Sequence, residues 1–131
     1  MSPDLDLVRS ILALWQRGDF SETRWAHPDI EFVIADGPDA TSMVGRGAMT
    51  VAWREFLGAF ADYAITADEY RELEGHRVYV RLHASGRGKA SGAAIGGQHG
   101  ANAFEIRGGL VTRLAVYFDY RHALEDLGLP E

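Results

Sequence analysis

The sequence predicts an α+β fold, in which helices gather on one face of a curved, mainly antiparallel sheet. Two observations support this prediction. Apolar residues recur at helical spacing in the first half of the chain, and they alternate with polar residues, as in strands, from about residue 63 onward. Helices and one strand followed by a strand meander are typical of α+β domains. If the sheet curls, an apolar pocket is expected between it and the helices.

Two segments have the pattern of amphipathic helices. The first begins at Ser2-Pro3, because a hydroxyl residue followed by proline favours a helix start, and it ends near Gly18. The second covers about 48–61, where apolar residues fall at i, i+3, i+4, i+7, i+8 and i+11. A short helix is also expected between Ser21 and Pro28, and the chain is expected to close with a helical turn after the last strand.

The strands are recognised by β-branched and aromatic residues and by alternation of apolar and polar side chains. Turn-forming residues separate them, and 36–47 is expected to be a loop rich in such residues. The predicted strands are 29–35, 63–73, 77–84, about 93–106 and 110–120.

Length and composition limit the function. The 131 residues fit a single domain, 1–131, and the formal net charge of -6 disfavours nucleic-acid binding because phosphates would be repelled. The chain has no cysteine, which excludes disulfides and thiolate chemistry and suits a reducing compartment. Neither a signal-peptide pattern nor a membrane-spanning apolar run is found. We therefore expect a cytoplasmic protein with no nucleic-acid or membrane partner.

The segments WQRGDF, HPDIEF, GRGAMTVAWREFLGAFADY, GHRVYVRLHASGRGKASG and RGGLVTRLAVYFDYRHALEDLGL resemble the SnoaL-like group of the nuclear transport factor 2-like superfamily. The resemblance implies a cone-shaped α+β barrel with a deep internal cavity, and a homodimer formed through the convex sheet face. It says less about function, since this fold hosts isomerases, cyclases, hydrolases, binding proteins and adaptors.

The positions where catalytic relatives carry their chemistry hold other residues in this chain. Ketosteroid isomerase needs a tyrosine, a carboxylate base and a protonated acid; the resemblance places these at Ile11, Ile34 and Asn102. Polyketide cyclases and limonene epoxide hydrolase place an aspartate at the position of Val116, and the hydrolase places a second aspartate two residues after the position of Arg81. The catalytic pattern of these relatives is therefore not retained.

Asn102 is the leading candidate for a ligand-binding polar group. It alternates with Phe104 and Ile106, so the three should face the cavity, where the amide could orient a ligand carbonyl or hydroxyl. The alternative is an amide bonded to a neighbouring side chain or to buried water. The other expected pocket residues are apolar, and ordinary core packing is the alternative for each: Trp15, Phe32, Ile34, Trp53, Phe56, Phe60, Phe104 and Val116.

Three residues are weak candidates for acid–base catalysis. His27 and Asp29 flank a proline turn at the expected rim of the cavity, and a histidine near a carboxylate is a possible acid–base pair. The same residues also make a sound turn. Asp36 is the carboxylate nearest to the lost base position and could replace it if the strand register shifted by two residues.

The outer sheet face is expected to carry Tyr117 and Asp119, which serve an interface or cap the closing helical turn. No metal is expected, because the five histidines lack ligand spacing, and if the strands that carry His83 and His99 pair about a turn near residue 88, His83 faces the region of residue 95 rather than His99. No cofactor is expected either. GRGKASG joins two strands and lacks the phosphate-loop pattern.

Three functions remain open at this point. The leading one is binding of a small, largely apolar or aromatic molecule in the internal pocket, with Asn102 as the polar anchor. The second is a cofactor-free isomerase, cyclase or hydrolase that uses His27, Asp29 or Asp36 with Asn102. The third is a non-catalytic assembly module whose convex face carries the interface, through Tyr79, Arg81, His83 and Tyr117.

Overall fold

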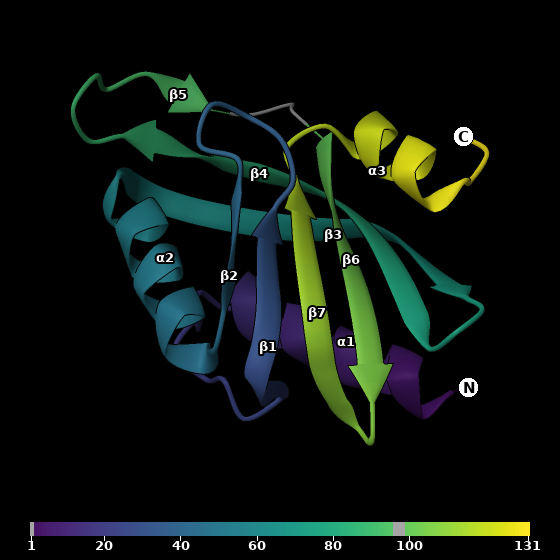
Figure 1. Cartoon of the computed structure of the whole chain (residues 1–131). Helices are drawn as coiled ribbons and strands as arrows, with labels where there is room; N and C mark the ends of the chain where they lie inside the picture. The colour runs from purple at the N-terminus through teal and green to yellow at the C-terminus, as the bar shows by residue number, and fades with distance from the viewer. Residues whose placement is uncertain (1, 96–98) are drawn as a thin grey trace.

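The computed structural model describes residues 2–95 and 99–131 and confirms the α+β fold (Figure 1). Helices and strands follow one another in nearly the predicted order. They are α1 (Pro3–Gln16), β1 (Ala26–Ile34), β2 (Thr41–Val44), α2 (Arg46–Gly58), β3 (Phe60–Leu73), β4 (Arg77–Gly88), β5 (Ala94–Ile95), β6 (His99–Arg107), β7 (Leu110–Tyr117) and α3 (Tyr120–Leu127).

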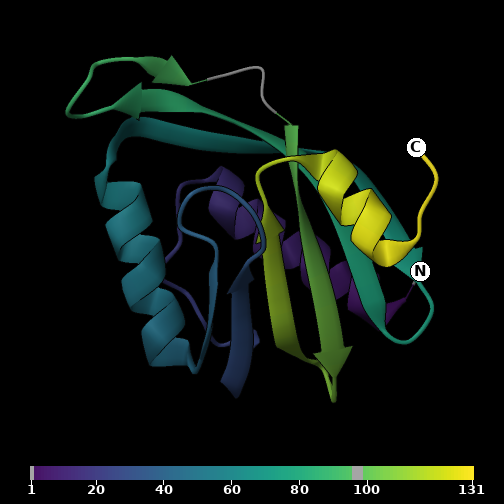
Figure 2. The same ribbon diagram turned by 45° about the horizontal axis from the view of Figure 1, so that its top comes forward.

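One mixed sheet forms the centre of the fold. Its strands lie in the order β2-β1-β7-β6-β4-β3, with β5 paired to β4 outside this path. Neighbours are antiparallel except β1 and β7, which run parallel with Phe32 opposite Leu114. The path begins at β2 and ends at β3, so the sheet is strongly curved but not closed (Figures 1 and 2). The curved, cone-shaped α+β fold that the resemblance implied is therefore confirmed, with an open sheet.

Two helices pack on the concave face, as predicted. Helix α1 contacts β3 and β4 and buries Val8, Ile11, Leu12 and Trp15 in the main core. Ser2 caps this helix, since its hydroxyl accepts a hydrogen bond from the backbone N–H of Leu5 at 3.0 Å. Helix α2 contacts β1, β2 and β3. Among the described residues, no helix is long and apolar enough to cross a membrane.

Helix α3 lies on the opposite, outer face of the sheet (Figure 2). It contacts β6 and β7 and buries Ala123 and Leu124 against a second, smaller core. The expectation that helices cover one face only is thus right for α1 and α2 and wrong for α3. Asp119 caps α3 by accepting a hydrogen bond from the N–H of Arg121 at 3.0 Å, so β7 ends at Tyr117 instead of residue 120.

The structure differs from the sequence prediction in two short segments. The helix expected after Ser21 does not form in this described stretch, because Asp19 accepts hydrogen bonds from the Ser21 backbone and hydroxyl and fixes a turn instead. The predicted loop 36–47 contains β2, which pairs with β1. Of the strand predicted at 93–106, residues 96–98 lie outside the described residues, and β5 and β6 account for the rest.

Candidate functional site

A cavity of about 190 Å³ lies between the two inner helices and the concave face of the sheet. Its walls come from α1, α2 and from several strands, and most of the wall residues are aromatic or aliphatic. The lining side chains include Trp15, Phe20, Phe32, Ile34, Ala52, Trp53, Phe56, Phe60, Tyr63, Ile65, Leu82, Ala84, Asn102, Val116 and Phe118. A concave, partly open and largely apolar space with few polar groups is typical of small-molecule sites.

The aromatic residues of the wall are in contact with one another. The Trp53 ring lies 5.5 Å from those of Trp15 and Phe20 and 5.8 Å from that of Phe32, measured between ring centroids. Phe56 packs edge-on against Tyr63, with centroids 5.4 Å apart. Such pairs add stability beyond the area they bury and hold one another in place. The cavity is therefore lined by a continuous aromatic surface.

Most of the predicted pocket residues line this cavity, and Phe104 does not. Phe104 is fully buried and stacks on Trp15, with ring centroids 6.1 Å apart, so it supports the wall from behind. Alternation had placed it correctly on the inner face but did not show that Trp15 covers it. The wall also includes Phe20, Tyr63 and Phe118, which the sequence analysis did not select. The signal for Tyr63 was its position two residues before Ile65 in the same strand, which places both side chains on the inner face.

Asn102 is the buried polar residue of the inner face. It lies in the middle of β6, opposite Val80 of β4 and Val116 of β7, and is 4% exposed. In the part of the chain that the structure describes, its side-chain amide makes no hydrogen bond with the protein, and it lines the cavity. The fully enclosed side-chain atoms that lack a partner among the described residues are the Tyr79 hydroxyl and Arg81 Nε, not the Asn102 amide, so this amide remains accessible from the cavity and a bound molecule can reach it.

Tyr63 supplies a second polar group in the wall. Burial raises the pKa of Tyr63 to about 12, so its hydroxyl keeps its proton at neutral pH. A protonated phenol can donate a hydrogen bond to a ligand oxygen. The cavity therefore offers an amide and a phenol against an aromatic background.

A family model for the SnoaL-like domain matches residues 8–114. The chain belongs to the SnoaL-like family. Among curated proteins, the uncharacterized protein Rv0034 of Mycobacterium tuberculosis is 35% identical over 121 residues, and the match covers 88% of each chain. The SnoaL-like fold extends beyond this relative to solved structures of much lower sequence identity.

Two solved structures illustrate that likeness. An NTF2-like protein of unknown function from Burkholderia pseudomallei superposes with a TM-score of 0.80 at 17% identity, covering 95% of this chain and 97% of that chain. TerC, co-crystallised with polyporic acid, superposes with a TM-score of 0.76 at 19% identity, covering 96% of this chain and 98% of TerC. At these identities the likeness shows the SnoaL-like fold alone.

Three of the positions at which the resemblance led us to expect catalytic groups hold apolar residues, and a fourth is Asn102. Ile34 and Val116 line the cavity, and Ile11 lies fully buried on the core-facing side of α1. Ile34, Val116 and Asn102 lie side by side on β1, β7 and β6, so the two aliphatic side chains continue the apolar wall on one side of Asn102. The cavity surface is therefore shaped for contact with apolar groups.

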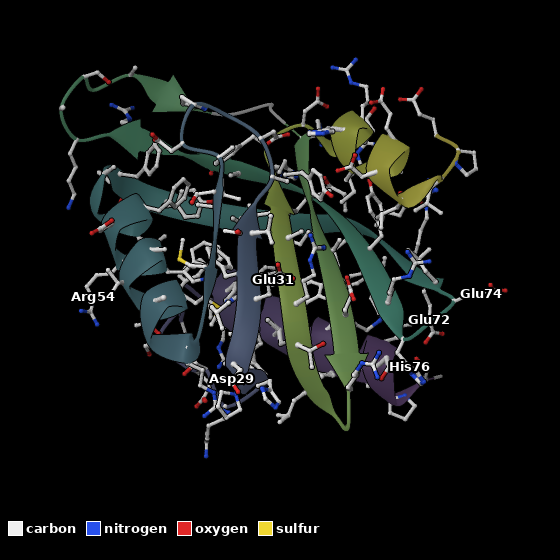
Figure 3. All side chains as sticks on the ribbon, in the orientation of Figure 1. Asp29, Glu31, Arg54, Glu72, Glu74 and His76 are labelled. Carbon is white, nitrogen blue, oxygen red and sulfur yellow. The ribbon has the colours of Figure 1, made fainter. Side chains whose placement is uncertain are left out.

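The acid–base candidates lie away from the cavity wall or are held in other contacts. His27 Nδ1 accepts a hydrogen bond from the N–H of Asp29 at 3.0 Å, which is a turn contact near the start of β1 (Figure 3). Asp36 accepts hydrogen bonds from the N–H of Phe118 at 2.7 Å and from His122 Nδ1 at 3.2 Å. This contact with Asp36 raises the pKa of His122 above its usual value. Asp36 thus connects the end of β1 to α3.

The outer face of the SnoaL-like sheet is packed under α3. Tyr79 is fully buried and Tyr117 is 5% exposed, so the expectation that both tyrosines are displayed for assembly is wrong. The Tyr117 hydroxyl donates a hydrogen bond to Asp126 of α3 at 2.9 Å. Another expectation fails on this face: His83 pairs directly with His99, not with the region of residue 95.

Proposed function

We propose that this SnoaL-like protein binds a small, largely apolar, aromatic molecule in the inner cavity and holds one polar group of it through Asn102. The observation that carries this proposal is the buried Asn102 amide, which faces an aromatic-walled cavity without a hydrogen bond from the described protein. Burial of an aromatic ligand supplies most of the affinity, and the amide and the Tyr63 hydroxyl fix its orientation.

TerC gives independent support for the class of ligand. It has the same fold and was co-crystallised with polyporic acid. The wall of the present cavity has the aromatic side chains that suit flat molecules, with Trp15 and Trp53 tilted against each other at 5.5 Å. The isomerase, cyclase and hydrolase alternatives depend on acidic groups at positions such as 34 and 116, and the aliphatic residues there favour binding.

The test compares two probes that differ in one hydroxyl group, 2-naphthol and naphthalene. Each is titrated by NMR into the wild-type chain and into Asn102→Leu. We expect 2-naphthol to bind wild type about two- to tenfold more tightly than naphthalene, because one neutral hydrogen bond contributes on that order. Asn102→Leu should bind both probes alike and should unfold at no lower a denaturant concentration than wild type.

Asn102 is the only asparagine of the sequence, which allows a direct observation. Protein labelled with ¹⁵N-asparagine gives a single side-chain amide pair, whose signals should move more with 2-naphthol than with naphthalene. Equal affinity of wild type and Asn102→Leu for 2-naphthol would reject Asn102 as the anchor. Polyporic acid serves as a third probe, and failure of 2-naphthol, naphthalene and polyporic acid alike to bind would reject the aromatic-ligand proposal.

Native mass spectrometry of freshly purified protein complements these titrations, since it identifies a co-purifying molecule and the oligomeric mass together. A homodimer through the outer face is part of the proposal. The outer face carries Arg113 between Glu31 and Glu105, at 3.0 and 3.5 Å, a charged surface beyond the α3 core. A purely monomeric mass would contradict the dimer. Cytoplasmic location stays a prediction, checked by cell fractionation.

A further inference from the structure

Asp68, His83 and His99 come together on the outer face of three neighbouring strands. His83 of β4 and His99 of β6 are paired directly across the sheet. The register of β3 against β4 shifts between Ala67 and Glu69, so Asp68 is the extra residue of a β-bulge. The bulge directs the Asp68 carboxylate to the face that carries the two imidazoles, where the three side chains meet.

The contacts in this cluster are close. His83 Nδ1 lies 2.9 Å from both carboxylate oxygens of Asp68, and His99 Nδ1 lies 3.3 Å from Oδ2. The two imidazole rings are 5.6 Å apart between centroids. Both Nδ1 atoms therefore approach the same carboxylate on β3, His83 from the neighbouring strand β4 and His99 from β6, the next strand in the sheet.

We propose that Asp68, His83 and His99 bind one divalent transition-metal ion of the Zn²⁺ type. Two imidazole nitrogens and one carboxylate oxygen are a common three-ligand set for such ions, with water in the remaining position. The site lies on the opposite face of β4 and β6 from the cavity, since His83 and His99 alternate with the cavity-lining Leu82 and Gly100. It is therefore independent of the proposed ligand.

The geometry needs only small side-chain rotations to bind an ion. The three donor atoms lie within 4.8 Å of one another, and a tetrahedral ion with bonds of about 2.1 Å requires donors about 3.4 Å apart. The side chains of His83, His99 and Asp68 are 38%, 39% and 29% exposed, so an ion and its water ligand can enter from solvent.

The surroundings of the cluster position one of the histidines. The His99 ring packs edge-on against Tyr120 at the start of α3, with centroids 6.4 Å apart. Arg81, two residues before His83, places its guanidinium 3.9 Å from the centre of the same Tyr120 ring. Tyr120 thus restricts the rotation of His99 and binds the nearby positive charge of Arg81, which favours a fixed ligand geometry.

The chain contains a matched control for this site. His76 Nδ1 lies 2.8 Å from Asp4 Oδ2, a single histidine–carboxylate pair at the β3–β4 turn beside the start of α1 (Figure 3). It has the same pairwise contact as His83 and Asp68, and the described residues bring no second histidine to it. His76→Gln should therefore leave specific metal binding unchanged.

The experiment is calorimetric titration of the EDTA-treated full chain with ZnCl₂, followed by visible spectroscopy of the Co²⁺-loaded protein. We expect one ion per chain and the absorption bands of four-coordinate Co²⁺. His83→Gln, His99→Gln and Asp68→Asn should each weaken binding by about tenfold or more, since even outer contacts of a metal site cost that much. Circular dichroism checks that each variant remains folded.

Three outcomes would overturn the proposal: a wild-type chain without Co²⁺ bands, a His83→Gln/His99→Gln chain that binds Zn²⁺ as tightly as wild type, or a His76→Gln chain that loses affinity to the same degree. In those cases the cluster is a hydrogen-bonded histidine–carboxylate triad only.

Discussion

The inner and outer faces of β6 and β7 carry polar groups in opposite states. On the inner face, the Asn102 amide is buried against a cavity and has no hydrogen-bond partner in the described residues. On the outer face, the Tyr117 hydroxyl bonds to Asp126, and Asp36 joins Phe118 to His122. On β6 and β7 the outer polar groups are thus paired with groups of α3 and the loop after β1, whereas the inner amide borders the cavity; the buried groups of the described residues that lack a partner, the Tyr79 hydroxyl and Arg81 Nε, lie on the neighbouring strand β4.

Whether a polar group already has a partner in the protein decides if it contributes to stability or is free for binding. Polar groups that already have partners stabilise the native state when they are kept and cost free energy when they are lost. A polar group without a partner contributes little to stability and can be used for recognition. Variants on the two faces should therefore affect different measurements.

The largest difference is expected between Leu124→Ala and Ile34→Ala. Leu124 is 4% exposed in the packed outer core, and its truncation should lower the free energy of unfolding by about 2–4 kcal/mol. Ile34 lines an existing cavity and is only half-buried, so its truncation should cost less. Urea denaturation measures both values. A smaller cost for Leu124→Ala than for Ile34→Ala would contradict the division between the faces.

A pair of tyrosines gives a smaller but sharper contrast. Tyr117→Phe removes the hydrogen bond to Asp126 and should cost about 0.5–1.5 kcal/mol of stability. Tyr117 also borders the cavity, but its hydroxyl is bonded on the outer face, so 2-naphthol affinity should change less than in Tyr63→Phe. Tyr63→Phe, on the cavity wall, should keep stability and weaken binding. Thermal unfolding and the NMR titration separate the two effects. If both variants changed the same quantity, the separation of stability from binding would be wrong.

The smallest effect is a dependence of stability on pH. The hydrogen bond to Asp36 raises the pKa of His122 from its ordinary 6.5 in the folded chain. A raised pKa means that this contribution is present below pH 6.5 and is lost as the pH rises through the folded value. Because the pair is partly exposed, we expect the unfolding temperature to fall by only about 1–3 °C. His122→Gln should not show this decrease, and an identical pH profile would rule out His122 as its source.

Features that depend on local spacing could be predicted from the sequence. Alternation placed Asn102 and Val116 on the inner face, and helical spacing predicted α1 and α2 within two or three residues at each end. Asp119 was recognised as a possible cap because the residue type and its place before a helix define that role.

Features that depend on register across the sheet were not predictable in this way. Pairing of His83 with His99 requires an offset across a turn that a glycine-rich sequence does not define. The bulge at Asp68 is a one-residue irregularity with no distinct residue signal. Burial of Tyr79 and Tyr117 depends on where α3 packs, which is a tertiary contact and not a property of the strands themselves.

The parallel pairing of β1 with β7 also has a consequence for synthesis on the ribosome. The two strands come from near the beginning and near the end of the chain, and Phe32 reaches its partner Leu114 only when β7 has been made. The β3–β4 hairpin can form earlier, from neighbouring residues. During translation β1 can therefore pair with β2 and contact α2 at once, but its other edge stays unpaired until β7 has been made, and such an open strand edge favours association with other chains.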